Sequence, residues 1–241
     1  MTRPVRLGVL TPSSNTALEP LTSAIAERLS GVTVHFSRFR VTEISLEDRA
    51  LAQFDDTNML AAAQLLADAK VDAIGWSGTS SGWLGFEADR RLCDRIRERT
   101  GIAATTAVLA LNELLALRDI TRLALVTPYT DDVQQRIIAN YRSLGIDVVA
   151  ERHLGLRVNH EFAGIEPATL MTLMREVAAV GPQAITTFCT NLRAAALVQH
   201  SEIELGIPVL DTVSTAMWGM LRAAGRAPAQ VHGWGELFQW T

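Results

Sequence analysis

Short apolar runs and helical repeats alternate along the whole chain. The apolar runs that end in a polar turn, as buried strands do, include residues 5–10, 71–76, 123–126 and 184–187. The segments between them place apolar residues at helical spacing, for example over residues 18–29 and 169–180. This alternation predicts an α/β fold with mostly parallel sheets. Ligands in such sheets bind beyond the carboxyl ends of the strands, so the polar turns are the places to look for a site.

The chain also contains an internal repeat. LGVLTP at residues 7–12 matches LALVTP at 123–128, and AIGWSGT at 73–79 matches AITTFCT at 184–190. Each match is short, and chance is the alternative, but the order is kept and a third pair, GI at 101 and at 206, continues it. We therefore predict two pseudo-symmetric duplicated lobes, residues 1–115 and 116–241, each a mostly parallel sheet flanked by helices. The last helix, about residues 212–224, is free to pack back on the first lobe.

Composition narrows the class of protein. The 241 residues are 48% hydrophobic and 20% charged, with a net charge of −4 and no basic cluster, so we expect neither nucleic acid nor a membrane as partner. The N-terminus carries no signal-peptide pattern, and two cysteines are too few for a disulfide scaffold, which together favour the cytoplasm. The five histidines lack metal-ligand spacing, so no metal site is expected. The sequence leaves open whether the chain forms a homo-oligomer.

Cys189 lies where a predicted strand gives way to a predicted helix over residues 192–197. A helix N-terminus offers free N–H groups and a positive dipole end, which bind anions and favour a thiolate. A buried structural cysteine is the alternative. By the internal repeat, Gly78 stands at the corresponding position of the first lobe. Cys93 falls inside a charged helical segment, and we expect it to be structural.

If the lobes pack about a pseudo-two-fold axis, four turns converge on one cleft. They are residues 12–15, 78–80, 128–130 and 189–191. These turns supply hydroxyls, amides and backbone N–H groups but no lysine or arginine. Such a cleft suits a small carboxylate substrate that is bound by hydrogen bonds.

Three of these turns resemble motifs of a known family. PSSNT at 12–16, TPY at 127–129 and CT at 189–190 resemble the Asp/Glu racemase superfamily, in its subgroup of maleate isomerases and arylmalonate decarboxylases. The resemblance covers about residues 5–223. It implies that Cys189 and Tyr129 are catalytic. The substrate-binding residues that the turns and the resemblance together indicate are Pro12, Ser13, Asn15, Gly78, Thr79, Ser80, Thr190 and Asn191.

The residue at position 78 distinguishes the activities that the resembling family contains. Racemases and isomerases of the superfamily use two cysteines, whereas glycine followed by Thr79 and Ser80 resembles the arylmalonate decarboxylase pattern. We therefore expect a cofactor-independent decarboxylase of a malonate-type acid, in which hydroxyl and N–H donors hold the enediolate and Cys189 protonates it. A Gly78→Cys variant is then expected to gain some racemising ability. The candidates for an apolar lining are Trp76, Trp83, Leu84 and Phe188.

Two other functions stay open at this point. One is a cis-trans isomerase or racemase of a small dicarboxylate or amino acid derivative, for example in a catabolic route such as ectoine utilisation. The other is a non-catalytic, two-lobed carboxylate-binding protein.

Overall fold

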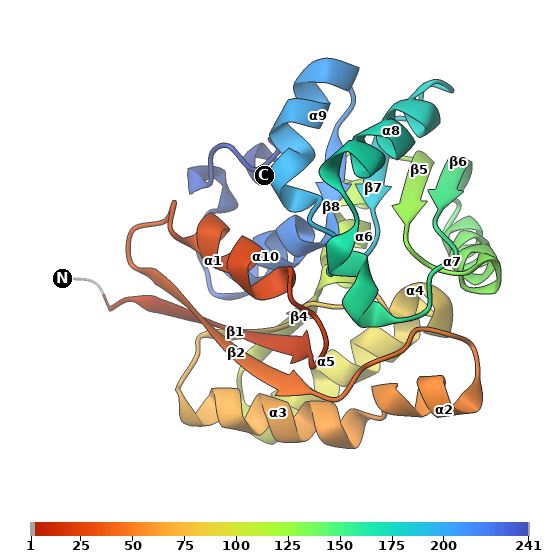
Figure 1. The fold of residues 1–241 in the computed structure, drawn as a ribbon. Coiled ribbons are helices and arrows are strands. Elements are labelled where there is room, and N and C mark those ends of the chain that lie inside the picture. The colour runs from red at the N-terminus through yellow and green to blue at the C-terminus, as the bar shows by residue number, and fades with distance from the viewer. Residues whose placement is uncertain (1–2, 241) are drawn as a thin grey trace.

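A computed structural model describes residues 3–240 as two parallel four-stranded sheets with helices packed around them (Figure 1). The strand order is β2-β1-β3-β4 in the first sheet and β6-β5-β7-β8 in the second. The same order therefore occurs twice, in sequence as in space, and the predicted fold class is confirmed. The two central strands also pair alike, with Leu7 opposite Ala73 in one sheet and Leu123 opposite Ala184 in the other.

The strands are short, and most of their residues are buried. The first sheet contains β1 (Val5–Pro12), β2 (Val32–Phe39), β3 (Ala73–Trp76) and β4 (Ala103–Thr106). The second contains β5 (Arg122–Thr127), β6 (Asp147–His153), β7 (Ala184–Thr187) and β8 (Val209–Asp211). All residues of β3 and β7 are buried, which explains why both read as continuous apolar or small-residue runs.

The described residues contain ten α-helices. They are α1 (Leu18–Ala26), α2 (Asp48–Leu51), α3 (Asp56–Asp68), α4 (Ser81–Leu84), α5 (Phe86–Thr100), α6 (Ala107–Leu117), α7 (Asp131–Ser143), α8 (Pro167–Ala178), α9 (Val198–Leu205) and α10 (Thr212–Ala223). Side chains cap several of them: Thr106 accepts the N–H of Leu109, and Asp211 accepts the first N–H groups of α10. Within residues 3–240, no helix combines the length and the apolar character that crossing a membrane requires.

The helix predicted directly behind Cys189 is wrong. Residues 190–194 form turns, a 3₁₀ turn covers Ala195–Leu197, and α9 begins only at Val198. The Asn191 side chain explains the difference, because its Oδ1 accepts the N–H groups of Thr16 (3.0 Å) and Ala17 (3.2 Å). These bonds hold the segment against the start of α1, so the dipole of a following helix does not act on Cys189.

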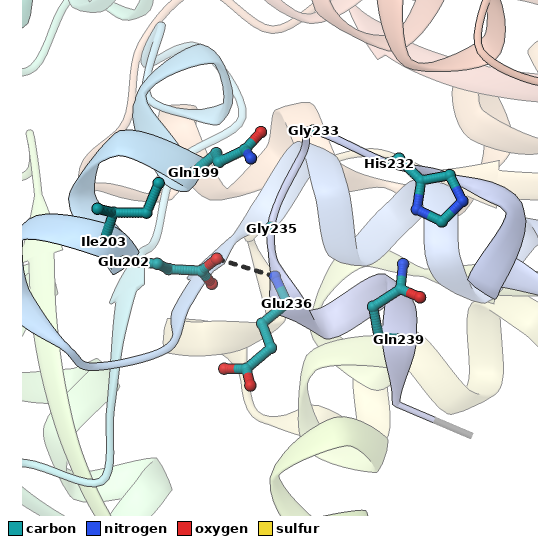
Figure 2. A pocket seen from close by; sticks show the side chains of 8 residues that line it. All are labelled: Gln199, Glu202, Ile203, His232, Gly233, Gly235, Glu236 and Gln239. Carbon is teal, nitrogen blue, oxygen red and sulfur yellow. Dashed lines mark hydrogen bonds between the residues drawn. The ribbon is translucent and has the colours of Figure 1, made fainter.

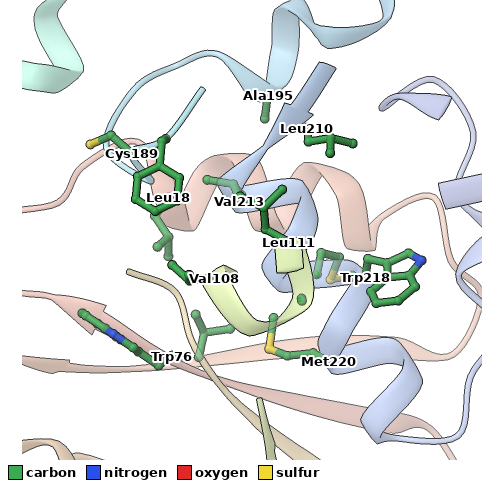
Figure 3. Packing of buried hydrophobic residues seen from close by; sticks show 14 of the residues in the cluster. Leu18, Trp76, Val108, Leu111, Cys189, Ala195, Leu210, Val213, Trp218 and Met220 are labelled. Carbon is green, nitrogen blue, oxygen red and sulfur yellow. The ribbon is translucent and has the colours of Figure 1, made fainter. Parts of the chain in front are cut away.

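Helix α10 follows the last strand of the second sheet but packs against elements of the first. Its Thr215 Oγ1 donates to the Ala107 carbonyl at the start of α6 (2.8 Å). Met220 lies so close to Gly75 in β3 that a Cβ there would be 2.5 Å from the Met220 Cγ. Trp218 and Met220 of α10 share one apolar core with Trp76 and Cys189 (Figure 3). The core is therefore continuous between the two sheets.

Asp89 is a buried carboxyl group in α5 near the carboxyl end of the first sheet. Its Oδ2 accepts hydrogen bonds from Ser81 Oγ (2.7 Å) and from Thr106 Oγ1. Burial raises the pKa of Asp89 to about 6, and the two hydroxyls offset only part of that effect. Asp89 thus links α4, α5 and the end of β4 through an acid that folding favours in its protonated form.

The stability of the protein should fall as this acid loses its proton. The pKa of Asp89 in the folded protein is about 6, above its usual value of 3.8. The stabilisation that comes from the protonated Asp89 carboxyl group is therefore present below about pH 4 and is lost as the pH rises through about 6. From pH 4 to pH 7, the unfolding free energy of Asp89→Asn should gain about 2 kcal/mol relative to that of the wild type. Urea unfolding at several pH values measures this difference. Asp94→Asn, on the exposed side of α5, is the control, and a constant difference for Asp89→Asn would contradict the assignment.

Candidate active site

A narrow cavity of about 20 Å³ lies where the carboxyl ends of β1, β3, β5 and β7 meet. Its lining consists of Pro12, Val41, Ile44, Phe54, Trp76, Gly78, Thr79, Ser80, Trp83, Tyr129, Asn159, Cys189 and Thr190. The four turns that the repeat places together are therefore all represented. The cavity has room for about one water molecule, so a larger ligand must displace part of the lining.

Cys189, Tyr129 and Thr79 form a chain of polar groups across the cavity. Tyr129 follows β5, and its phenol oxygen lies 2.6 Å from Oγ1 of Thr79, which follows β3. Either of these two hydroxyls can donate to the other. Burial is the main reason that the pKa of the Tyr129 phenol is raised, and a hydrogen bond with the Cys189 side chain adds to it. The same bond with Tyr129 acts to lower the pKa of the thiol.

The surroundings keep Cys189 in its thiol form. Burial is the largest influence and raises the pKa of Cys189 to about 11, with a smaller contribution from the charge of Asp211. The Tyr129 hydroxyl and the N–H groups of Asn191 and Leu192 act in the opposite direction. At neutral pH the side chain is therefore a protonated acid with donors placed to receive the negative charge it would leave behind.

Three predicted binding residues lie outside the cavity lining. Ser13 is exposed, and its hydroxyl donates to the Val41 carbonyl (3.3 Å). Asn15 is buried; its Oδ1 caps the start of α1, and its Nδ2 donates to Thr190 Oγ1 (3.2 Å). Asn191 holds the residues that precede α1. The structure thus places these side chains behind the cavity wall, where they orient residues that line it.

The segment after β2 and the segment after β6 close one side of the cavity. Asn159 belongs to a 3₁₀ turn (Asn159–Gly164), and its N–H donates to the Thr42 carbonyl (3.1 Å). Ile44 N–H donates to the Arg157 carbonyl (2.9 Å). These bonds bring Val41, Ile44 and Asn159 to the lining. The polar connection around Asn159 predicts either a cover for the cleft or a solvated loop, and the structure places Asn159 at the cavity. No pattern in the sequence indicates the positions of Val41 and Ile44.

The four candidates for an apolar wall divide into two pairs. Trp76 and Trp83 line the cavity, and Trp83 packs edge-on against Tyr129 with ring centroids 5.4 Å apart. Phe188 is fully buried against Tyr141 in the core, and Leu84 is 40% exposed. The apolar part of the cavity therefore comes from the first sheet and the segment after β2.

The lining contains no charged side chain in the part of the chain that the structure describes. Within residues 3–240 there is also no group of three or more His, Cys, Asp or Glu side chains that could hold a metal ion. A separate, open groove lies beside the C-terminal segment (Figure 2). Its Glu202 carboxylate accepts the N–H groups of Val209 (3.0 Å) and Glu236 (2.9 Å), which is a structural role.

Comparison with known proteins identifies the family. The sequence model of the arylmalonate decarboxylase family matches residues 31–238. The chain belongs to the arylmalonate decarboxylase family. A curated member, the arylmalonate decarboxylase of Bordetella bronchiseptica, is 32% identical over 165 residues, which is 67% of this chain and 68% of that protein. The maleate isomerase of Pseudomonas putida is 28% identical over 240 residues, which is 95% of each chain.

Solved structures give the same picture for this family member. A mutant of the Nocardia farcinica maleate cis-trans isomerase with a covalently bound succinylcysteine intermediate superposes with a TM-score of 0.90, at 25% identity and over 98% of this chain and 99% of that one. A liganded mutant of arylmalonate decarboxylase superposes with a TM-score of 0.84 over 99% of this chain and all of the other, at 23% identity, which shows the shared fold. The named relatives are enzymes of two kinds, and the comparisons support an enzyme without deciding between them.

The pH dependence of alkylation tests the protonation state of Cys189 in this family member. Iodoacetamide should label Cys189 with a midpoint near the pKa of about 11, so that labelling at pH 8 is on the order of 100-fold slower than that of a free thiol. Tyr129→Phe should move the midpoint higher, because it removes a donor to the thiolate. Peptide mass spectrometry resolves the two cysteines, and Cys189→Ala is the control. A midpoint at or below that of a free thiol would contradict the assignment.

Proposed function

We propose that this chain is a cofactor-independent decarboxylase of a malonate-type acid, with Cys189 as its proton donor. The observation that carries the proposal is the pairing of one buried, protonated thiol with glycine at the matching position of the first sheet. Gly78 and Cys189 each stand two residues beyond the end of a central strand, β3 and β7, and both line the cavity. The site thus offers one acid on one side of a bound substrate.

The uncharged donors of the cavity suit the charge that decarboxylation creates. In the proposed complex, one carboxylate of the substrate accepts hydrogen bonds from Thr79, Ser80 and Tyr129. When the second carboxylate leaves as CO2, its bonding electron pair moves into the retained group and forms an enediolate. Hydroxyl donors around these oxygens stabilise the new charge. The neighbouring apolar side chains, Trp83 among them, favour loss of the charged group as neutral CO2.

Protonation completes the proposed reaction. The Cys189 S–H bond breaks, its proton forms the new C–H bond at the α-carbon, and the sulfur is left as a thiolate. Tyr129 and the N–H groups of Asn191 and Leu192 are placed to receive that charge. Water then returns a proton to the sulfur. The sum is one dicarboxylate and one proton converted into one monocarboxylate and CO2.

Isomerisation of a small dicarboxylate is the second candidate. Two observations favour it: the maleate isomerase relatives cover almost the whole chain, and the Asn159 amide adds a polar group at the cavity. The succinylcysteine seen in the Nocardia farcinica enzyme is a covalent cysteine adduct. A thiolate nucleophile would be needed for such an adduct, and the burial that raises the pKa of Cys189 opposes it. We therefore rank isomerisation below decarboxylation.

A substrate panel in D2O tests the proposal. We expect 2-methylmalonate to release CO2 and to give propionate with one deuterium incorporated per turnover, whereas maleate is not converted to fumarate. Cys189→Ala should lower kcat/KM by roughly 10²- to 10⁴-fold, which is typical of the loss of a general acid.

The matched control for this experiment is the second cysteine. Cys93 is buried in α5 and does not line the cavity, so Cys93→Ala should keep the wild-type rate. Conversion of maleate by the wild type, or deuterium exchange at a substrate carbon without CO2 release, would support the isomerase or racemase alternative instead.

A further inference from the structure

Trp76 occupies the space that a side chain at position 78 would need. A Cβ built on Gly78 would lie 2.5 Å from Cε2 and from Cη2 of the Trp76 indole. Real Cβ atoms do not approach ring carbons that closely, so any larger residue at position 78 must displace the indole. The sequence predicts that Gly78→Cys restores a second thiol, and the structure adds that Trp76 stands in its way.

The corresponding part of the second sheet is built differently. By the repeat, Thr187 at the end of β7 corresponds to Trp76 at the end of β3. The Thr187 hydroxyl donates to Asp211 Oδ2 (2.7 Å), and Thr187 does not line the cavity. On that side Cys189 therefore reaches the cavity unobstructed. On the other side, an indole covers the place of the matching side chain.

The indole is held in this position by its neighbours. Trp76 is 1% exposed, its ring centroid lies 5.0 Å from that of Phe39, and its Nε1 donates to Ser80 Oγ at 3.4 Å. Ser80 also lines the cavity, so the same contact joins the indole to a carboxylate-binding hydroxyl. Moving a closely packed aromatic side chain costs free energy. The tightly held Trp76 indole therefore helps to keep the cavity small.

We propose that Trp76 is the specificity-determining residue that limits the substrate to acids with a small α-substituent, such as hydrogen or methyl. We expect an aryl substituent to need part of the volume that the indole fills, since Trp76 lines this small cavity. The inference deepens the proposed decarboxylase function and rests on it for the identity of the substrate as a malonate-type acid. The steric limit itself concerns binding, which can be measured without turnover.

Binding of two monocarboxylates of different size tests whether Trp76 limits the size of the ligand. Propionate and phenylacetate resemble the products of a small and of an aryl-substituted acid, and their binding is read as protection of Cys189 against alkylation. Wild type should bind propionate at least about tenfold more tightly than phenylacetate. Trp76→Leu should lose or reverse that preference. Trp218→Leu, which removes another fully buried indole away from the cavity, should keep the wild-type preference.

A double-mutant cycle tests the steric contact in the absence of any ligand. Gly78→Ala alone should lower the Tm by roughly 2–12 °C, because the added methyl group meets the indole. The same change in the Trp76→Leu background should cost much less, since the obstructing ring is gone. Additive effects of the two substitutions would overturn the proposed contact.

These outcomes distinguish the size limit that Trp76 sets from the proposed decarboxylation. If wild type binds phenylacetate as tightly as propionate, Trp76 does not limit size, whether or not 2-methylmalonate is decarboxylated. If the carboxylates bind in the predicted order but no malonate loses CO2, the role of Trp76 in limiting size is supported and the proposed decarboxylase function is contradicted. If Trp218→Leu changes the preference as much as Trp76→Leu does, the role assigned to Trp76 is overturned.

Discussion

Hydrogen bonds between residues that follow the strands of opposite sheets hold the cavity in shape. Thr79 pairs with Tyr129, and Thr190 Oγ1 donates to the Ser77 carbonyl (3.0 Å) while accepting from Asn15. Each bond joins a turn of the first sheet to a turn of the second. The packing of the two halves and the geometry of the site therefore depend on the same few side chains.

The sequence predicted the parts of this arrangement that follow from repetition and from local pattern. Two matching sets of strands, each ending in a polar turn, were enough to place Gly78, Tyr129 and Cys189 in one cavity. The physical reason is that parallel strands bring their carboxyl ends to one edge, and pseudo-symmetric sheets bring two such edges together. The repeat alone likewise showed that Gly78 corresponds to Cys189.

Features that depend on how distant segments pack were not predictable in this way. The Ala-rich residues 192–197 have high helix propensity, but Asn191 is held by backbone donors of the first lobe, and that tertiary contact overrides the local preference. Asn159 and Ile44 reach the cavity only because the segments after β2 and β6 hydrogen bond to each other. No periodicity within either segment signals that pairing.

In the proposed reaction, the sulfur of Cys189 gives a proton to the substrate and forms no bond to carbon. Intact-mass spectrometry of the protein, acid-quenched during incubation with 2-methylmalonate and with maleate, tests this. We expect the protein to stay unmodified with both compounds while propionate forms from 2-methylmalonate. A mass increase of one substrate molecule, located on Cys189 and absent in Cys189→Ala, would contradict it.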